Sequence, residues 1–255
     1  MQLKKFQVIN SPFPIIFIKN SLKKRLCNKI AKEIELHNNY DDNVMGGRNR
    51  INKGSNNFFN FLKISKNSKR FYSKINNHSY FKEIKKIFDK NFPNIIWNIP
   101  QFKFFSKKNY GLQKGKDLVM EKSKKSIVNL DMDFSLSNSG YAREPHRDRE
   151  TRIINFLVYL NTIPKNYGGA LKIYSLKKNT NKKKILESRF PNKKNIRLEK
   201  KFFPKKGDAI IFLSSPDSYH GVSKFKPNGN HKRVFIYGSF SLNKSVEWVK
   251  KTNLY

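Results

Sequence analysis

The stretch HRDRETRIINFLVYLN, residues 146–161, decides the fold that we predict for this chain. It opens with His146 and Asp148 and continues into an apolar run of strand length, residues 152–161, which ends in turn-forming residues. Residues two apart on an extended segment project to the same face, so these two side chains can point at one ion. Two imidazoles and one carboxylate are the ligand set of mononuclear non-haem iron(II). On position, His220 supplies the second imidazole.

Four further segments have the length, composition and turn signals of β-strands: 168–174, 204–213, 219–225 and 233–240. A ligand from a late strand reaches the first pair only where the sheet curls, as it does in a β-sandwich or barrel with Greek-key connections. Alternation along the last segment predicts that one set of side chains faces the interior, namely Arg233, Phe235, Tyr237 and Ser239.

The order of these motifs resembles that of the 2-oxoglutarate- and iron(II)-dependent dioxygenases, specifically their prolyl 4-hydroxylase-like branch. The elements H-x-D, Y-L-N, G-G-x-L, a P-x-x-G turn, and a late His with a basic residue all occur between residues 128 and 242. The resemblance implies a double-stranded β-helix, a cupin-like jelly roll of two facing sheets. The expected fold class is mainly β with flanking helices (α+β), with N-terminal helices packed on one sheet.

The resemblance also implies a role for particular residues. The expected metal ligands, which are also the catalytic residues, are His146, Asp148 and His220. The residues expected to bind the co-substrate are Arg233, Tyr159 and Leu171. A planar guanidinium offers two parallel donors to a carboxylate and keeps its charge when buried, which suits Arg233 to the far carboxylate of 2-oxoglutarate.

Two departures from the family pattern leave alternatives open. Residues 226–232 form a turn-rich insertion before Arg233, which makes Lys232 a substitute anchor. Upstream of the triplet, relatives place a tyrosine that touches the co-substrate, whereas here the candidates are Phe134 and Tyr141. That role is not assigned from the sequence.

The implied reaction uses Fe(II), 2-oxoglutarate and O2, with ascorbate as an optional reductant, and releases succinate and CO2 while it hydroxylates an unactivated C–H bond. The expected substrate is a prolyl or other amino-acid residue in a peptide or protein, or a small molecule. One alternative is a nucleic-acid demethylase of the same chemistry, but Ser239 stands where that relative has a second arginine. Another alternative is an inactive jelly-roll binding protein, which the complete ligand set argues against.

The N-terminal part reads as a helical support. Helices are expected over residues 22–36, capped by Ser21, and 80–89, preceded by Ser79, with a loop over 38–57 between them. We expect residues 1–120 to form this support, integrated with the core, and residues 121–255 to form the dioxygenase core.

The composition indicates in which cellular compartment the protein is expected and which classes of partner it is expected to bind. The single Cys27 excludes an intramolecular disulfide, and no segment reads as a secretory signal or a membrane span, so we expect a cytoplasmic protein with no membrane partner. The net charge of +36 would suit an anionic partner, but the lysines are spread evenly rather than clustered, which disfavours nucleic acid. The densest cluster, 177–194, is expected to be a solvated loop near the barrel mouth that could steer an acidic substrate. The sequence predicts neither the substrate nor the oligomeric state.

The remaining imidazoles and a second carboxylate pair are interpreted as structural. His37 and His78 have no carboxylate or imidazole neighbour at ligand spacing, and His231 lies in the insertion before Arg233, where it is expected to be exposed. Asp131 and Asp133 share a face on an earlier strand and are expected to bond neighbouring loops.

Overall fold

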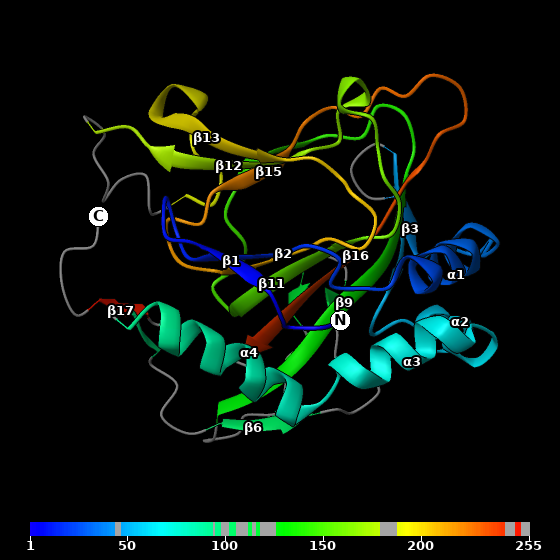
Figure 1. Ribbon diagram of the computed structural model, residues 1–255, viewed down its shortest axis with the longest axis horizontal. Coiled ribbons are helices and arrows are strands. Elements are labelled where there is room, and N and C mark those ends of the chain that lie inside the picture. Colours follow the sequence, from blue (N-terminus) through cyan, green and yellow to red (C-terminus); the bar gives the residue numbers. More distant parts are fainter. Residues whose placement is uncertain are drawn as a thin grey trace.

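The molecule consists of two facing β-sheets, with a layer of helices on the outer side of the larger one (Figure 1). The computed structural model describes residues 1–43, 47–93, 95–97, 102–105, 112–113, 116–117, 126–178, 188–242 and 248–250.

The larger sheet runs in the order β1-β2-β14-β11-β16-β9-β4-β3, with β6 parallel to β9. Its strands are β1 (Phe6–Ile9), β2 (Ile15–Ile18), β3 (Asp42–Asn43), β4 (Arg48–Asn52), β6 (Phe102–Phe105), β9 (Ser126–Ser137), β11 (Arg152–Tyr159), β14 (Ala209–Leu213) and β16 (Arg233–Leu242). Every residue of β11 and β14 is buried, because these central strands face the small sheet on one side and the helices on the other.

The smaller sheet has the order β10-β15-β12-β13 and is antiparallel. Its strands are β10 (Arg143–His146), β12 (Leu171–Leu176), β13 (Ile196–Phe202) and β15 (His220–Val222). Short 3-10 turns, η1 (Lys165–Tyr167) and η2 (Lys193–Asn195), precede β12 and β13. All five strands expected from the sequence are present, and the predicted jelly-roll architecture with flanking helices is confirmed.

Two glycines explain why β12 begins later than expected. Gly168 and Gly169 have φ of +76° and +69°, a left-handed backbone that disfavours other residues. A Cβ at Gly168 would lie 2.1 Å from the carbonyl oxygen of Lys224. The glycine pair is therefore a turn that packs against the loop after β15, and strand β12 starts at Leu171.

The helices are α1 (Lys24–Glu35), α2 (Asn56–Ile64), α3 (Lys66–Ile75) and α4 (His78–Asn91). The two predicted helices are confirmed as α1 and α4, but their expected caps are wrong. The Ser21 hydroxyl donates to the Gly207 carbonyl instead of capping α1. The cap of α4 is Asn77, whose side chain accepts from the Ser79 backbone N–H.

The expected loop over residues 38–57 is wrong in its centre. Residues 48–52 form β4, which pairs with the long strand β9. Arg48 and Arg50 turn their side chains to the interior cavity, while Ile51 is buried in the core. A strand with arginines on its inward face has no apolar alternation, so its sequence reads as a loop.

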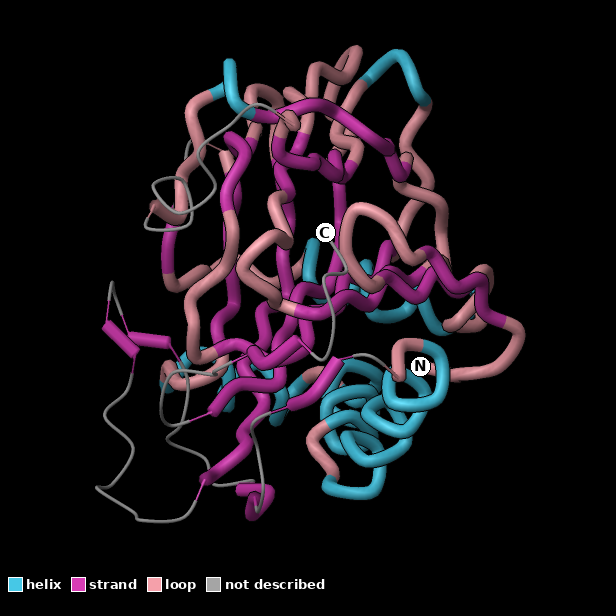
Figure 2. Tube along the Cα trace, turned by 90° about the vertical axis from the view of Figure 1, so that its left-hand side faces the viewer, coloured by secondary structure: helices cyan, strands magenta, loops and turns pink. Residues whose placement is uncertain are grey.

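The helices cover the outer face of the large sheet and lie together on one side of it (Figure 2). Phe134 of β9 packs against Phe58 and Phe61 of α2, with ring centroids 5.7 and 5.1 Å apart. Phe81 of α4 lies 5.0 Å from Phe240 of β16. The expected packing of N-terminal helices on one sheet is confirmed.

Four short strands complete the description: β5 (Ile95–Trp97) with β17 (Trp248–Lys250), and β7 (Leu112–Gln113) with β8 (Lys116–Asp117). Strands β1 to β4 from the N-terminal part join the main sheet. The expected domain boundary between residues 120 and 121 lies outside the described residues and stays a prediction. Half of the basic cluster, residues 179–187, also lies outside them. Within the described ranges, no helix has the length and apolar character needed to cross a membrane.

Candidate metal centre

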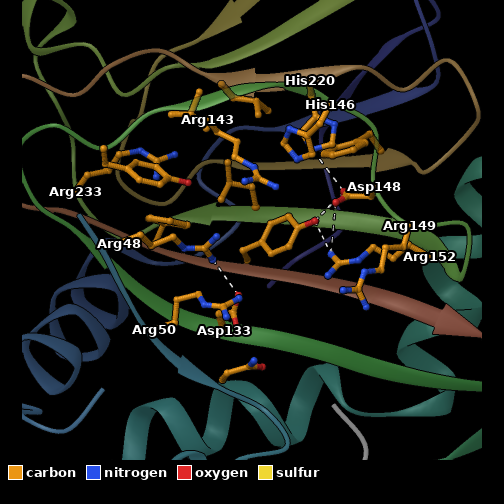
Figure 3. A pocket seen from close by; sticks show the side chains of 18 of the residues that line it. Arg48, Arg50, Asp133, Arg143, His146, Asp148, Arg149, Arg152, His220 and Arg233 are labelled. Atoms are coloured by element: carbon orange, nitrogen blue, oxygen red, sulfur yellow. Dashed lines mark hydrogen bonds and ion pairs between the residues drawn. The ribbon is translucent and has the colours of Figure 1, made fainter. Parts of the chain in front are cut away.

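The three expected ligands meet between the two sheets. His146 ends β10, Asp148 follows it in the next loop, and His220 opens β15, the neighbouring strand. His146 and His220 are direct partners across that ladder. One ligand atom from each of the three residues lies within 4.8 Å of the others, which is close enough to surround a single ion (Figure 3).

Backbone carbonyls orient both imidazoles. Nδ1 of His146 lies 2.8 Å from the Glu144 carbonyl oxygen, and Nδ1 of His220 lies 2.9 Å from that of Ser218. A carbonyl can only accept, so each Nδ1 carries the proton and donates it. Each Nε2 is therefore left with a lone pair for a metal, and Nε2 of His220 is 3.5 Å from Asp148 Oδ2.

Burial and proximity also keep the imidazoles neutral. The pKa of His146 is lowered to about 3, first by burial and then by the neighbouring His220. Burial likewise lowers the pKa of His220. Because a metal binds the neutral imidazole, no proton has to be displaced from either ring near neutral pH.

Asp148 is held by two residues that the sequence did not single out as partners. The Tyr237 hydroxyl donates to Asp148 Oδ2 at 2.8 Å. Arg152 donates to that hydroxyl at 2.5 Å and lies 4.0 Å from Asp148 Oδ1. Burial opposes ionisation of Asp148, but the charge of Arg152 and the hydrogen bond from the Tyr237 hydroxyl lower the pKa of the carboxyl. The carboxylate is thus ionised and fixed in place.

Arg233 lies on the opposite side of the same cavity and is 1% exposed. Its Nε donates to the Gly169 carbonyl oxygen at 2.9 Å. The terminal nitrogens Nη1 and Nη2 make no well-aligned hydrogen bond to a described residue. The Phe235 and Tyr159 rings lie beside the guanidinium, 4.1 and 5.5 Å from Cζ. A buried cation whose two terminal nitrogens lack well-aligned partners calls for an anionic ligand.

The other expected co-substrate residues also lie near Arg233. Leu171 lines the cavity, and Tyr159 is buried, with burial raising the pKa of its hydroxyl to about 12. Lys232 is exposed, so its role as a substitute anchor is wrong. Of the two upstream candidates, Tyr141 lines the cavity and Phe134 packs under the helices instead.

The cavity has a volume of about 630 Å³, in the range of sites for small molecules. As expected from strand alternation, Arg233, Phe235 and Tyr237 line it, whereas Ser239 is buried outside it. Its basic lining was not predicted as a group and comprises Arg48, Arg50, Arg143, Arg149, Arg152, Arg189 and Arg233. These residues come from strands and loops far apart in the sequence, which is why no local pattern groups them.

The second carboxylate pair behaves differently from the expectation. Asp133 lines the cavity and pairs with Arg48 at 2.9 Å and Arg50 at 3.6 Å, both on strand β4 rather than a loop. Asp131 accepts from the Ser241 hydroxyl at 3.1 Å.

The three remaining histidines lie away from the ligands. His37 bonds to Asn57 at 3.0 Å, His78 opens α4, and His231 is exposed.

A family model described as the 2OG-Fe(II) oxygenase superfamily matches residues 132–240. Residues 132–240 belong to the 2OG-Fe(II) oxygenase superfamily. The family predicted from the sequence is thereby confirmed. This oxygenase is a 2-oxoglutarate-dependent dioxygenase, and its predicted cofactors, Fe(II) and 2-oxoglutarate, are those of its family.

Solved structures show the same fold. HygX from Streptomyces hygroscopicus, solved with nickel and 2-oxoglutarate bound, has a TM-score of 0.50 and 10% identity, over 89% of this oxygenase and 82% of that chain. A prolyl 4-hydroxylase from Phytophthora capsici has a TM-score of 0.50 and 10% identity, over 89% and 58%. The Pseudomonas putida prolyl-4-hydroxylase has a TM-score of 0.48 and 13% identity, over 89% and 91%. No curated protein matches the chain.

The residues of this oxygenase fit the groups that its family implies. Two neutral imidazoles and an ionised carboxylate are a donor set that suits Fe(II), and they line only part of the cavity. The unused donors of Arg233 fit the far carboxylate of 2-oxoglutarate.

Proposed function

We propose that His146, Asp148 and His220 bind Fe(II), that Arg233 binds the far carboxylate of 2-oxoglutarate, and that the enzyme hydroxylates an unactivated C–H bond. The observation that carries this proposal is the buried guanidinium of Arg233, whose two terminal nitrogens have no well-aligned partner, in the same cavity as the three ligands. Tyr159 and Leu171 flank the bound co-substrate, and Tyr141 takes the upstream contact that the sequence left unassigned.

The bound metal and 2-oxoglutarate supply the oxidising chemistry, with O2 as oxidant and succinate and CO2 as products. The protein's own residues supply geometry and charge. Tyr237 and Arg152 fix the carboxylate of Asp148, and the Glu144 and Ser218 carbonyls fix the two rings. Such outer contacts orient metal ligands and tune their affinity.

Apolar side chains exclude water from the reacting region. Leu157, Leu171, Phe212 and Phe235 line the cavity together with the ligands. The Phe212 ring lies 4.9 Å from that of His220. An apolar wall at this position would limit side reactions with solvent once the metal is bound.

The substrate proposed is a prolyl or other amino-acid residue, in a peptide or free, or a related small molecule. The motif order shared with the prolyl 4-hydroxylase-like branch supports this choice. The site does not support the nucleic-acid demethylase. Ser239 occupies the position of that relative's second arginine, is fully buried, and donates its hydroxyl to the Phe240 carbonyl.

The test is turnover with a panel of candidate substrates. The purified protein is supplied with Fe(II), 2-oxoglutarate, ascorbate and air, and offered proline-rich peptides, free amino acids and an N-methylated oligonucleotide. We expect succinate formation to be stimulated by an amino-acid or peptide substrate, and the product to gain one oxygen atom by mass spectrometry. Formaldehyde release from the oligonucleotide, without oxygen gain in any peptide or amino acid, would overturn the proposal in favour of demethylation.

A further inference from the structure

The basic residues that line the cavity are arginines, although most basic residues of the chain are lysines. The sequence has 54 basic residues, of which 43 are lysines and 11 are arginines. Seven of the arginines line the cavity, and no lysine from the part of the chain that the structure describes lines it. A diffuse excess of basic residues would bring mostly lysine to any surface. The arginines are therefore not a by-product of composition.

The charge of the cavity is unbalanced. Among the described residues that line it, seven guanidinium groups face the three carboxylates of Asp41, Asp133 and Asp148, an excess of four positive charges. A divalent metal adds two charges and the 2-oxoglutarate dianion removes two, so the excess persists in the loaded enzyme. Charges confined in a cavity are screened less than charges on the surface.

Four of the seven arginines already have a function in the structure or in the proposed reaction. Arg233 is the proposed anchor of 2-oxoglutarate, and Arg152 holds Tyr237 beside Asp148. Arg48 and Arg50 share the carboxylate of Asp133. The other three are Arg143, Arg149 and Arg189, which also contact the protein itself; Nε of Arg189, for example, donates to the Arg147 carbonyl oxygen at 3.4 Å.

These three arginines lie near the metal ligands. Arg143 starts β10, three residues before His146, and lies between Arg233 and the two histidines in Figure 3. Arg149 directly follows Asp148 in the chain. Burial lowers the pKa of the Arg189 guanidinium; the charge of Asp148 opposes this shift, and the charge of Arg149 adds to it.

The loop that carries Arg189 also brings an aromatic ring to the site. Phe190 is 54% exposed, yet its ring lies 6.2 Å from that of His146 and nearly parallel to it. The guanidinium of Arg189 lies over the Phe190 ring at 5.7 Å. The open side of the cavity beside the metal therefore combines cations with an apolar platform.

We propose that the substrate carries a compact group with two negative charges, a phosphate or a pair of carboxylates, which binds between Arg143, Arg149 and Arg189. This inference rests on the proposed function. Guanidinium groups bind such oxygens in pairs of parallel hydrogen bonds, which a lysine does not provide. The basic residues converge inside a cavity rather than along an extended surface track, which favours a small anionic group over nucleic acid.

The test measures anion binding to the loaded enzyme without turnover. Under anaerobic conditions, with Mn(II) and saturating 2-oxoglutarate, the protein is titrated by calorimetry with inorganic phosphate, O-phosphoserine and γ-carboxyglutamate. Serine, which lacks the phosphate of O-phosphoserine, is the matched control. The phosphate and carboxylate arms distinguish the two sources of charge. We expect saturable binding of at least one anionic probe and none of serine.

Matched variants locate the binding. Arg143→Gln and Arg189→Gln are each expected to weaken the anionic probe about 10-fold or more, the loss typical of one charge-assisted contact. Arg25→Gln removes an exposed arginine of α1 and is expected to change nothing. Arg149→Gln tests the third arginine of the proposed site and is expected to weaken the anionic probe in the same way. Thermal unfolding shows whether each variant is folded.

The possible results separate the two proposals. If the wild type fails to bind Mn(II) and 2-oxoglutarate, the proposed function fails. If that complex forms but no anionic probe binds, or if the probes bind all variants equally, this inference alone is overturned. Binding of a single-stranded oligonucleotide, with none of the small probes, also overturns it.

Discussion

At the scale of single residues, the site depends on side chains that hold the ligands as much as on the ligands themselves. Asp148 is fixed by the Tyr237 hydroxyl at 2.8 Å, and Arg152 holds that hydroxyl from β11. Without them, a carboxylate on a loop would have other rotamers available. The metal affinity should therefore depend on a tyrosine that never touches the metal.

Tyr237→Phe removes one hydroxyl and leaves the ring in place. We expect the Kd for Mn(II) to rise about 10- to 100-fold, which is the usual effect of losing a group that orients a ligand. Calorimetric titration of the metal measures it. Tyr40→Phe, which removes a remote hydroxyl bonded to the Ile34 carbonyl, is the control. An unchanged Kd in Tyr237→Phe would show that Asp148 needs no such support.

Gly169→Ala tests whether the backbone at Gly169 positions the guanidinium of Arg233. The added Cβ would lie 3.0 Å from Cδ of Arg233, at a φ of +69° that disfavours alanine. The displaced guanidinium should bind 2-oxoglutarate at least about 10-fold more weakly, the loss of one charge-assisted contact, while Mn(II) binds as before. Parallel titrations with each ligand separate the two effects, and equal loss of both would point to misfolding instead.

The proposed ligands and the proposed anchor could be picked out from the sequence because each lies in a short motif with its own strand signal. Arg152 and Tyr237 were visible as strand residues, but their partnership was not. They lie on neighbouring strands, β11 and β16, but Arg152 pairs with Ser241 and Tyr237 pairs with Leu157, so the two meet only through their long side chains. Arg143 and Arg189 likewise belong to segments that meet only in the folded barrel.

At the scale of elements, the helical layer packs on the outer face of the large sheet and stabilises it. Phe134 is fully buried between β9 and α2, against Phe58 and Phe61. Phe134→Ala should lower the free energy of unfolding by about 3–5 kcal/mol, because it leaves a cavity in a packed core. Denaturant unfolding measures it.

Ile64→Ala on the same helix is the matched control. Ile64 is 78% exposed, so its loss should change stability by less than about 0.5 kcal/mol. Equal effects of the two substitutions would mean that α2 does not pack on the sheet as described.

The elements that the sequence predicted were those with clear periodicity. The core strands and the helices α1 and α4 have apolar patterns that match their final faces. Strand β4 was missed because its inward side chains are Arg48 and Arg50, whose burial depends on Asp133 of the neighbouring strand. Helices α2 and α3 were missed because the asparagine- and serine-rich stretch around them has the composition of a loop.

At the scale of the whole molecule, the neutral histidines make the metal-free protein sensitive to acid. The pKa of His146 is about 3 in the folded state against 6.5 for an ordinary histidine, so the unfolded chain binds more protons between these values. Stability therefore falls as the pH falls through this window.

Between pH 7 and pH 5, His146 alone should lower the free energy of unfolding of the metal-free protein by about 2 kcal/mol. Urea unfolding at several pH values measures this slope. His146→Asn removes the titrating group and should flatten the slope. A wild-type slope that is flat, or that rises towards acid, would contradict a buried neutral imidazole.

The central claim is that one cavity binds both Fe(II) and 2-oxoglutarate through the three ligands and Arg233. Anaerobic titration of the metal-free protein with both, while following the visible metal-to-ligand charge-transfer band, tests it most directly. We predict a band in the wild type, no band in His146→Ala, and a weakened band that needs more 2-oxoglutarate in Arg233→Ala. A folded wild-type protein that gives no band would contradict the account.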